Sequence, residues 1–168
     1  MREKLPSSTT GYMEPSVPSK PIRTILLVDD HEMVLRALHN YLEKQGFNLL
    51  EARDGEEALL IAECFPAVIH VLVTDVVMAR MNGRELVRRL LPLRPDMQVI
   101  MMSGFPDEVM AQRGLVPLAP MLQKPFPPQQ LLNTIEEVLA NPQSARTVAR
   151  LVQPLMPPSA EKADSTGA

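Results

Sequence analysis

Several short stretches of this sequence place a charged or hydroxyl side chain directly after an apolar run. The residues in these positions are Asp29, Asp30, Asp75, Ser103 and Lys124. In open α/β sheets, chemistry takes place just beyond the carboxyl ends of the strands, so these side chains are candidates to share one site. Carboxylates about 5 Å apart repel each other by about 3 kcal/mol per pair at an effective dielectric constant near 20. Protons or a cation must therefore compensate the cluster.

Mg²⁺ suits such a cluster because it binds one or two carboxylates and keeps room for water and phosphate oxygens. We expect Asp30 and Asp75 to be direct ligands, with Asp29 acting through water. The backbone carbonyl of Val77 completes the expected ligand set.

A carboxylate beside Mg²⁺, an ammonium group and a hydroxyl suits phosphoryl transfer, which depends on in-line placement and on neutralising the equatorial oxygens. Asp75 would attack phosphorus and become an acyl phosphate. One phosphoryl oxygen would then lie on Mg²⁺, a second on Lys124 and a third on the Ser103 hydroxyl, through charge-assisted hydrogen bonds. The backbone N–H groups of Val76 and Gly104 are expected within reach.

Hydropathy periodicity supplies the elements that would position these residues. Strands are predicted at residues 24–28, 47–51, 71–75, 98–102 and 121–123. Helices are predicted at residues 31–45, from Asp54 to Phe65, from Asn82 to Leu91, from Pro106 onward and at 128–140. Asp54 with Glu57 and Asn82 with Glu85 have the spacing of an N-cap and its partner. The alternation of strands and helices predicts a parallel sheet covered on both faces.

Composition bounds the rest of the chain. At 168 residues, with 45% hydrophobic residues, the chain predicts one domain with a sizeable core. Proline-rich, polar ends at 1–21 and 141–168 are expected to be flexible tails around a folded unit at 22–140, with a short helix at 145–152 in the second tail. The single cysteine, Cys64, lies on an apolar helical stripe and is expected in the core.

The net charge of −3 gives no reason to propose nucleic acid or an anionic membrane as a partner. No apolar stretch is long enough for a membrane span or a signal peptide. We therefore expect a soluble, cytoplasmic protein, either a monomer or a weak homodimer. Among the histidines, His31 could touch the acidic site but is expected on an exposed first turn of a helix, and His39 and His70 are read as isolated.

Each motif by itself is a weak indicator of function. As an ordered set, however, the motifs resemble those of the receiver domain of bacterial response regulators, the phosphoacceptor module of two-component signalling. The segments that carry the resemblance, over residues 22–140, are ILLVDD (25–30), DGEEAL (54–59), VTDVVM (73–78), MNG (81–83), MSGF (102–105) and QKPF (123–126). It implies a flavodoxin-like (βα)5 fold with strand order 2-1-3-4-5 and Mg²⁺-dependent phosphoryl transfer from a phosphohistidine onto Asp75. It also implies a cis peptide bond before Pro125. The segments MSGF (102–105) and LQKPF (122–126) particularly resemble those of receivers that are attached to, or work beside, hybrid sensor histidine kinases.

The sequence departs from the family pattern at several positions. Ala79 stands where proline is common, and Met121 replaces the aromatic residue that usually follows the hydroxyl inward on phosphorylation. Pro127 stands where a Ser or Thr N-cap would be unsurprising, and the segment 115–120 is rich in proline, which alters the expected partner face. We expect phosphoryl acceptance to be retained, whereas the ring on which aromatic-switch signalling depends is missing.

Two functional hypotheses follow. The first is a single-domain response regulator, phosphorylated by a sensor histidine kinase or a histidine phosphotransfer protein, that signals to a protein partner; we expect no output domain after residue 140. The second is a pseudo-receiver, a constitutive binding module without a phosphoryl cycle. A phosphohydrolase is a poor match because Val77 stands where such enzymes carry a second aspartate. A nucleotide-binding domain is equally poor because neither G-x-G-x-x-G nor a P-loop occurs.

Overall fold

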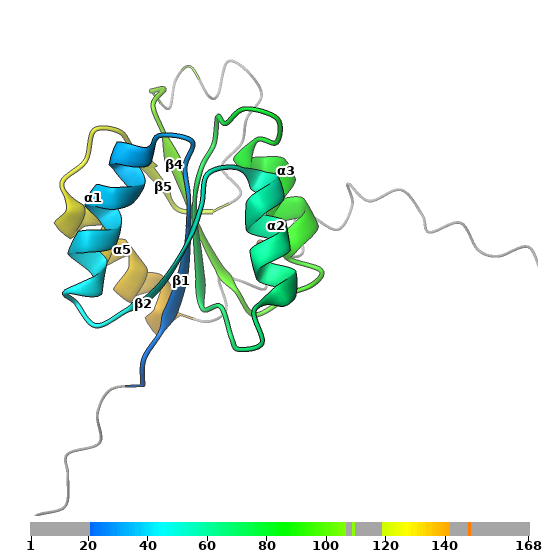
Figure 1. The fold of residues 1–168 in the computed structure, drawn as a ribbon. Helices are drawn as coiled ribbons and strands as arrows, with labels where there is room; N and C mark the ends of the chain where they lie inside the picture. Colours follow the sequence, from blue (N-terminus) through cyan, green and yellow to red (C-terminus); the bar gives the residue numbers. More distant parts are fainter. Residues whose placement is uncertain (1–20, 107–108, 110–118, 142–147, 149–168) are drawn as a thin grey trace, which may run out of the picture.

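The computed structural model describes residues 21–106, 109, 119–141 and 148. Its centre is a five-stranded sheet in the order β2-β1-β3-β4-β5, with all neighbouring strands parallel (Figure 1). The strands are β1 (Thr24–Val28), β2 (Asn48–Ala52), β3 (Val71–Asp75), β4 (Gln98–Ser103) and β5 (Met121–Gln123). The flavodoxin-like topology implied by the sequence is confirmed.

The three inner strands are buried along their whole length, whereas the outer strands β2 and β5 are only partly buried. This is the behaviour of near-continuous apolar runs covered on both faces. Successive side chains alternate between the faces. In β1, Leu26 and Val28 belong to one hydrophobic cluster, whereas Ile25 and Leu27 belong to the other.

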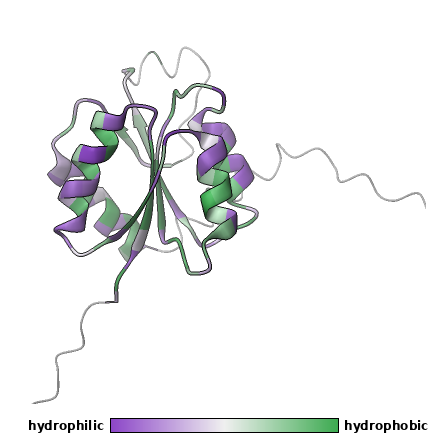
Figure 2. Cartoon of the chain, in the orientation of Figure 1, coloured by the Kyte–Doolittle hydropathy of each residue, from purple (hydrophilic) through white to green (hydrophobic). Residues whose placement is uncertain are grey.

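Helices cover both faces of the sheet. Helices α1 (Glu32–Glu43) and α5 (Pro128–Ala140) pack on one face, and α2 (Gly55–Cys64) and α3 (Gly83–Leu90) on the other (Figure 1). Apolar residues gather along the strands and the inner sides of the helices, and polar residues face outward (Figure 2). The amphipathic periodicity of the sequence thus places one apolar core on each side of the sheet.

Helix starts follow the predicted capping chemistry. The Asp54 carboxylate accepts the N–H groups of Glu56 and Glu57, both at 2.9 Å, and Asn82 Oδ1 accepts the Glu85 N–H at 2.9 Å. Glu57 reaches back one residue further than a standard capping box, to the N–H of Arg53 at 2.7 Å. Helix α5 begins without a side-chain cap, as expected from Pro127.

Several expectations need correction. Cys64 is exposed rather than in the core, because it is the last residue of α2 and the helix stripe has already turned outward there. His70 is not isolated, since its Nδ1 accepts the Thr24 N–H at 3.0 Å, and His39 Nδ1 lies 2.6 Å from Glu51 Oε1. The second strand is Asn48–Ala52, one residue later than predicted.

Other expectations fall largely outside the described residues. These are the tails at 1–21 and 141–168, most of the helix predicted after Pro106, and residues 115–118 of the proline-rich segment. Val148 is described; it is helical and packs into the core on the α2–α3 side. No helix in the described part of the chain is long and apolar enough to cross a membrane.

Arg94 has a structural role that the sequence pattern did not reveal. Its guanidinium donates to the carbonyl oxygens of Ala62, Phe65 and Ala67 at 2.6–2.7 Å. Carbonyls at a helix C-terminus lack partners within the helix. Arg94 therefore supplies hydrogen bonds at the end of α2 and ties it to the segment that follows α3.

Candidate functional site at the carboxyl edge of the sheet

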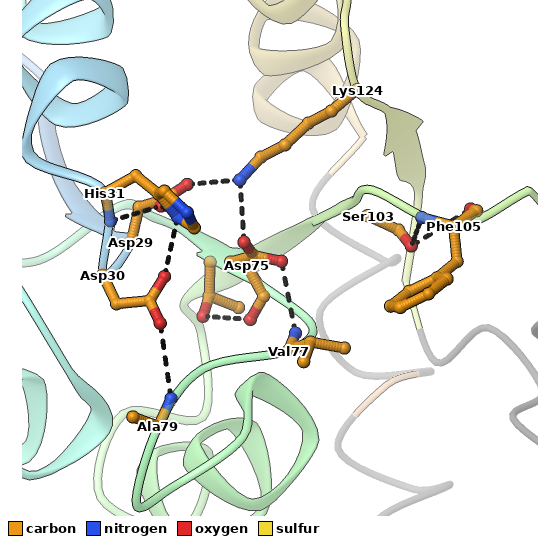
Figure 3. Close-up of polar contacts among 10 residues, drawn as sticks. Asp29, Asp30, His31, Asp75, Val77, Ala79, Ser103, Phe105 and Lys124 are labelled. Atoms are coloured by element: carbon orange, nitrogen blue, oxygen red, sulfur yellow. Dashed lines mark hydrogen bonds and ion pairs between the residues drawn. The ribbon is translucent and has the colours of Figure 1, made fainter.

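The sheet register brings the acidic residues together. Val28 in β1 pairs with Thr74 in β3, so the residues that follow them, Asp29 just after β1 and Asp75 at the end of β3, lie at the same level. Alternation along the strands directs Asp29, Asp75 and Lys124 to the face covered by α1 and α5. Figure 3 shows these side chains converging, together with Asp30 and His31.

Lys124 bridges the two buried carboxylates. Its Nζ lies 2.5 Å from Asp29 Oδ2 and 2.7 Å from Asp75 Oδ2. Asp29 is 0% exposed and Asp75 only 5% exposed. Burial by itself would lower the pKa of Lys124, but the hydrogen bonds to Asp29 and Asp75 outweigh it and raise the pKa above its usual value. Lys124 is thus held as a cation between two anions. The cis peptide bond between Lys124 and Pro125, implied by the resemblance, is present.

The carboxylate oxygen of Asp75 that Lys124 does not contact lies against the loop after β3. Asp75 Oδ1 accepts the N–H of Val77 at 3.2 Å. The Val76 N–H, expected within reach of a phosphoryl group, instead donates to the Met102 carbonyl at 2.8 Å. This is a correction with a simple cause: residue 76 still continues the β3–β4 hydrogen-bond ladder, and Val77 carries the first amide beyond it.

Asp30 and His31 form the outer rim of the cluster. Asp30 Oδ2 accepts the Ala79 N–H at 3.4 Å, which links the end of β1 to the loop after β3. His31 Nδ1 lies 2.9 Å from Asp30 Oδ1 and 3.2 Å from Asp29 Oδ1. The His31 side chain is exposed as expected, yet it also contacts the acidic site.

Ser103 lies at the same edge of the sheet, but its hydroxyl is engaged elsewhere. Ser103 Oγ accepts the Phe105 N–H at 3.0 Å and lies 3.2 Å from the Phe105 carbonyl oxygen, to which it donates. Asp75 pairs with Met102, so alternation turns the next residue, Ser103, toward the other face. Figure 3 shows Ser103 and Phe105 set apart from the Asp75–Lys124 contact. The structure thus gathers Asp29, Asp30, Asp75 and Lys124, with Ser103 beside them.

Arg80, in the loop after β3, and Gly83, the first residue of α3, support the site without having been identified from the sequence as doing so. A Cβ atom on Gly83 would lie 2.1 Å from the carbonyl oxygen of Asp75, so only glycine fits there without a shift of the backbone. Arg80, with a φ of 65°, forms an ion pair with Asp54 and so fastens this loop to the start of α2. The Asn-Gly motif marked the start of a helix, but this close approach is visible only in the fold.

The donor set fits a divalent cation. Ligand atoms of Asp29, Asp30, His31 and Asp75 all lie within 4.8 Å of one another. Three carboxylates against the single ammonium of Lys124 leave two negative charges, which a divalent cation would balance. A hollow of about 300 Å³ opens beside them, lined by residues that include Asp75, Val77, Gly104 and Lys124. The cluster is compatible with Mg²⁺ and with phosphorylation of an aspartate.

Comparisons with known proteins agree with the fold and with this cluster. Residues 25–136 match the family model of the response regulator receiver domain. The chain belongs to this family of two-component signalling, whose members act as phosphoacceptor domains.

Among curated relatives, the response regulator receiver protein CpdR of Brucella abortus is 33% identical over 119 residues, which cover 70% of this chain and 98% of CpdR. The sensor kinase CckA of the same organism is 37% identical over 118 residues, which cover 69% of this chain but only 12% of the kinase.

Solved structures give the same result. The receiver domain of the hybrid histidine kinase CckA superposes with a TM-score of 0.59 at 29% identity, over 69% of this chain and 98% of that one. A receiver protein from Sinorhizobium medicae gives a TM-score of 0.64 at 28% identity, over 73% and 98% of the two chains.

Proposed function

We propose that this protein is a single-domain response regulator that accepts a phosphoryl group on Asp75 from a phosphohistidine of a sensor histidine kinase or a histidine phosphotransfer protein. The observation that carries the proposal is the Lys124 ammonium, 2.7 Å from Asp75 Oδ2 and 2.5 Å from Asp29 Oδ2. A lysine placed between a nearly buried nucleophile and a second carboxylate can transfer a hydrogen bond from the carboxylate to an incoming phosphoryl oxygen.

In the proposed reaction, an Asp75 oxygen attacks phosphorus as the phosphorus–nitrogen bond of the phosphohistidine breaks. Such transfer depends on positioning and on charge neutralisation more than on proton transfer. Lys124 neutralises one phosphoryl oxygen, and the Val77 N–H, already directed at Asp75, stabilises another. The Ser103 hydroxyl can take part after it turns away from Phe105.

Mg²⁺ would be held by Asp30 and Asp75, with Asp29 acting through water and the Val77 carbonyl completing the ligand set. When bound, it supplies positive charge against the phosphoryl oxygens. The cluster of ligand atoms within 4.8 Å supports this assignment.

Signalling would follow as a population shift between two packings of the face that includes β5 and α5. Lys124 lies between these two elements, and Met121, at the position of the usual aromatic residue, is half-buried against the core. A flexible methionine can occupy either packing at little cost.

A pseudo-receiver is the second candidate. It is favoured by the engagement of Ser103 with Phe105 and by the absence of an aromatic ring at Met121. It is weakened by the free-energy cost of keeping the Asp29 carboxylate buried beside that of Asp75, because a pure scaffold would gain nothing from this arrangement.

Incubation with acetyl phosphate and Mg²⁺, followed by intact-mass spectrometry, tests the proposal. We expect the mass to rise by one phosphoryl group in the wild type, and not in Asp75→Asn or in the presence of EDTA. Asp96→Asn, in the segment between α3 and β4, is a matched control that should be phosphorylated like the wild type. An unchanged wild-type mass, with partner binding identical in Asp75→Asn, would support the pseudo-receiver instead.

A further inference from the structure

Val148 packs on the face of the sheet opposite to the helix that precedes it in the chain. Helix α5 ends at Ala140, and its buried residues belong to the hydrophobic core on the α1–α5 side. Val148 is only 4% exposed and belongs to the core on the α2–α3 side. The chain beyond α5 therefore returns to the domain on its other face.

Burial of this one side chain is large enough to hold a short segment in place. Fully burying a valine side chain favours the packed state over the detached state by roughly tenfold or more. Coupling between two sites of a protein commonly changes an equilibrium by about 5- to 150-fold. A contact of this size therefore keeps the segment docked, and an event at a second site is strong enough to release it.

The core that holds Val148 also contacts the residue that engages Ser103. Phe105 is partly buried and packs against this core, as does Met121. The Phe105 N–H donates to Ser103 Oγ at 3.0 Å, and the hydroxyl donates back to the Phe105 carbonyl oxygen at 3.2 Å (Figure 3). The Ser103 hydroxyl thus fixes the backbone of a residue whose ring belongs to the surroundings of Val148.

We propose that Val148 anchors the chain beyond α5 as an intramolecular docking element, and that phosphorylation of Asp75 weakens this docking through Ser103 and Phe105. The linkage rests on the proposed function, which assigns the phosphoryl group to Asp75. When the Ser103 hydroxyl turns to a phosphoryl oxygen, Phe105 loses both hydrogen bonds to it, and the core around Val148 loses a fixed neighbour. Release of the segment exposes the apolar surface that Val148 covers, a signal that needs no aromatic ring at Met121.

Limited trypsin digestion of the full chain measures the docking without a phosphodonor. Arg146 and Arg150 stand on either side of Val148 in the sequence, and a protease cleaves a chain that has opened locally. Val148→Asn should raise the rate of cleavage at these two sites by at least about tenfold. Cleavage at Arg53, between β2 and α2, reports opening elsewhere in the fold and should rise much less.

Val68→Asn is the matched control, because Val68 is 60% exposed, and it should change none of these cleavage rates. An equal rise at Arg53 in Val148→Asn would make Val148 an ordinary core residue of one cooperative unit. Unchanged cleavage beside residue 148 would mean that its side chain holds nothing in place. Either result overturns the proposal.

Acetyl phosphate with Mg²⁺ then tests the linkage, since Asp75 takes the phosphoryl group as acetate leaves. Cleavage at Arg146 and Arg150 should rise by at least about fivefold in the phosphorylated wild type, and not in Asp75→Asn. If Asp75 carries the phosphoryl group and these rates stay unchanged, the inference is overturned and the proposed function stands. If no phosphoryl group is added, the proposed function fails and the linkage with it, whereas the digestion of Val148→Asn still decides the docking.

Discussion

At the scale of single residues, the site depends on one lysine that compensates carboxylates hidden from water. Asp29 is fully buried, and Lys124 is the cation in contact with both it and Asp75. Removing one partner of a buried ion pair costs far more than the pair contributes, because the remaining charge loses its compensation. Lys124 is thus expected to stabilise the fold, in addition to its proposed role in phosphoryl transfer.

Lys124→Met should lower the free energy of unfolding by about 3 kcal/mol, because it leaves Asp29 and Asp75 uncompensated. Urea unfolding at neutral pH without divalent cations measures this. Lys44→Met, at the exposed end of α1, is the control and should change stability little. Equal stability of the two variants would contradict the buried bridge.

Gly83→Ala should destabilise the protein by about 1–3 kcal/mol, the usual cost of overpacking. Alanine in a helix is normally favoured over glycine by about 1 kcal/mol. At Gly83 the clash decides the sign, because the new Cβ would lie 2.1 Å from the Asp75 carbonyl oxygen. Gly104→Ala meets nothing within 4 Å and serves as the control in thermal unfolding. A Gly83→Ala variant that is more stable than the wild type would contradict this, since it would show that the backbone near Asp75 moves aside at little cost.

At the scale of elements, what the sequence could predict depended on the type of interaction. The buried strands and the caps Asp54 and Asn82 were predictable because apolar runs and capping spacings are local. Parallel strands share their carboxyl edge, so Asp75 and Lys124 could be expected to meet once the strand order was assumed.

The directions in which side chains and N–H groups point at the strand ends could not be predicted, because they depend on the register of strand pairing. A shift of one residue decides whether Ser103 or Met102 lies level with Asp75, and whether the N–H of Val76 or of Val77 is the first outside the β3–β4 ladder. The bonds from Arg94 to the end of α2 join residues about thirty positions apart in the sequence, and no local pattern signals them.

His70 joins the starts of β1 and β3 and makes the stability of the sheet depend on pH. Burial first, and the positive charge of Arg23 second, lower the pKa of His70 below its ordinary 6.5. The unfolded chain therefore binds the proton more readily than the fold does. The stabilisation is fully present above pH 6.5 and is lost as the pH falls below it.

His70→Asn should remove this contribution to the pH dependence, since an asparagine oxygen can accept the Thr24 N–H without titrating. Urea unfolding at a series of pH values between neutral and mildly acidic conditions measures the slope. The wild type should lose stability faster than His70→Asn as the pH falls. Parallel curves would mean that the Thr24–His70 hydrogen bond does not control this titration.

At the scale of the whole molecule, strand order converts distant sequence segments into one pocket. The central pair β1–β3 leads into the carboxylates, and the edge strand β5 is followed directly by the lysine that reaches past the end of β4 to them. A cation or a phosphoryl group bound at this edge, as proposed, would therefore contact segments from the beginning, middle and end of the folded unit.

The proposed Mg²⁺ pocket exists only in the folded state, so Mg²⁺ should raise the thermal stability of the entire fold. At a concentration one hundred times its dissociation constant, the gain is about 2.7 kcal/mol. Calorimetry over a series of Mg²⁺ concentrations measures it. Asp30→Asn should reduce the shift, and an identical shift in wild type and variant would place the cation elsewhere.

The central claim is that Asp75 carries the phosphoryl group. Treating the phosphorylated protein with borohydride reduces an aspartyl phosphate to homoserine, and mass spectrometry of the peptides then locates the altered residue. We predict homoserine at position 75 only, formed when Mg²⁺ is present and absent with EDTA. Modification at another residue, or none at residue 75 in fully phosphorylated protein, would contradict the assignment of this edge of the sheet as the phosphoacceptor site.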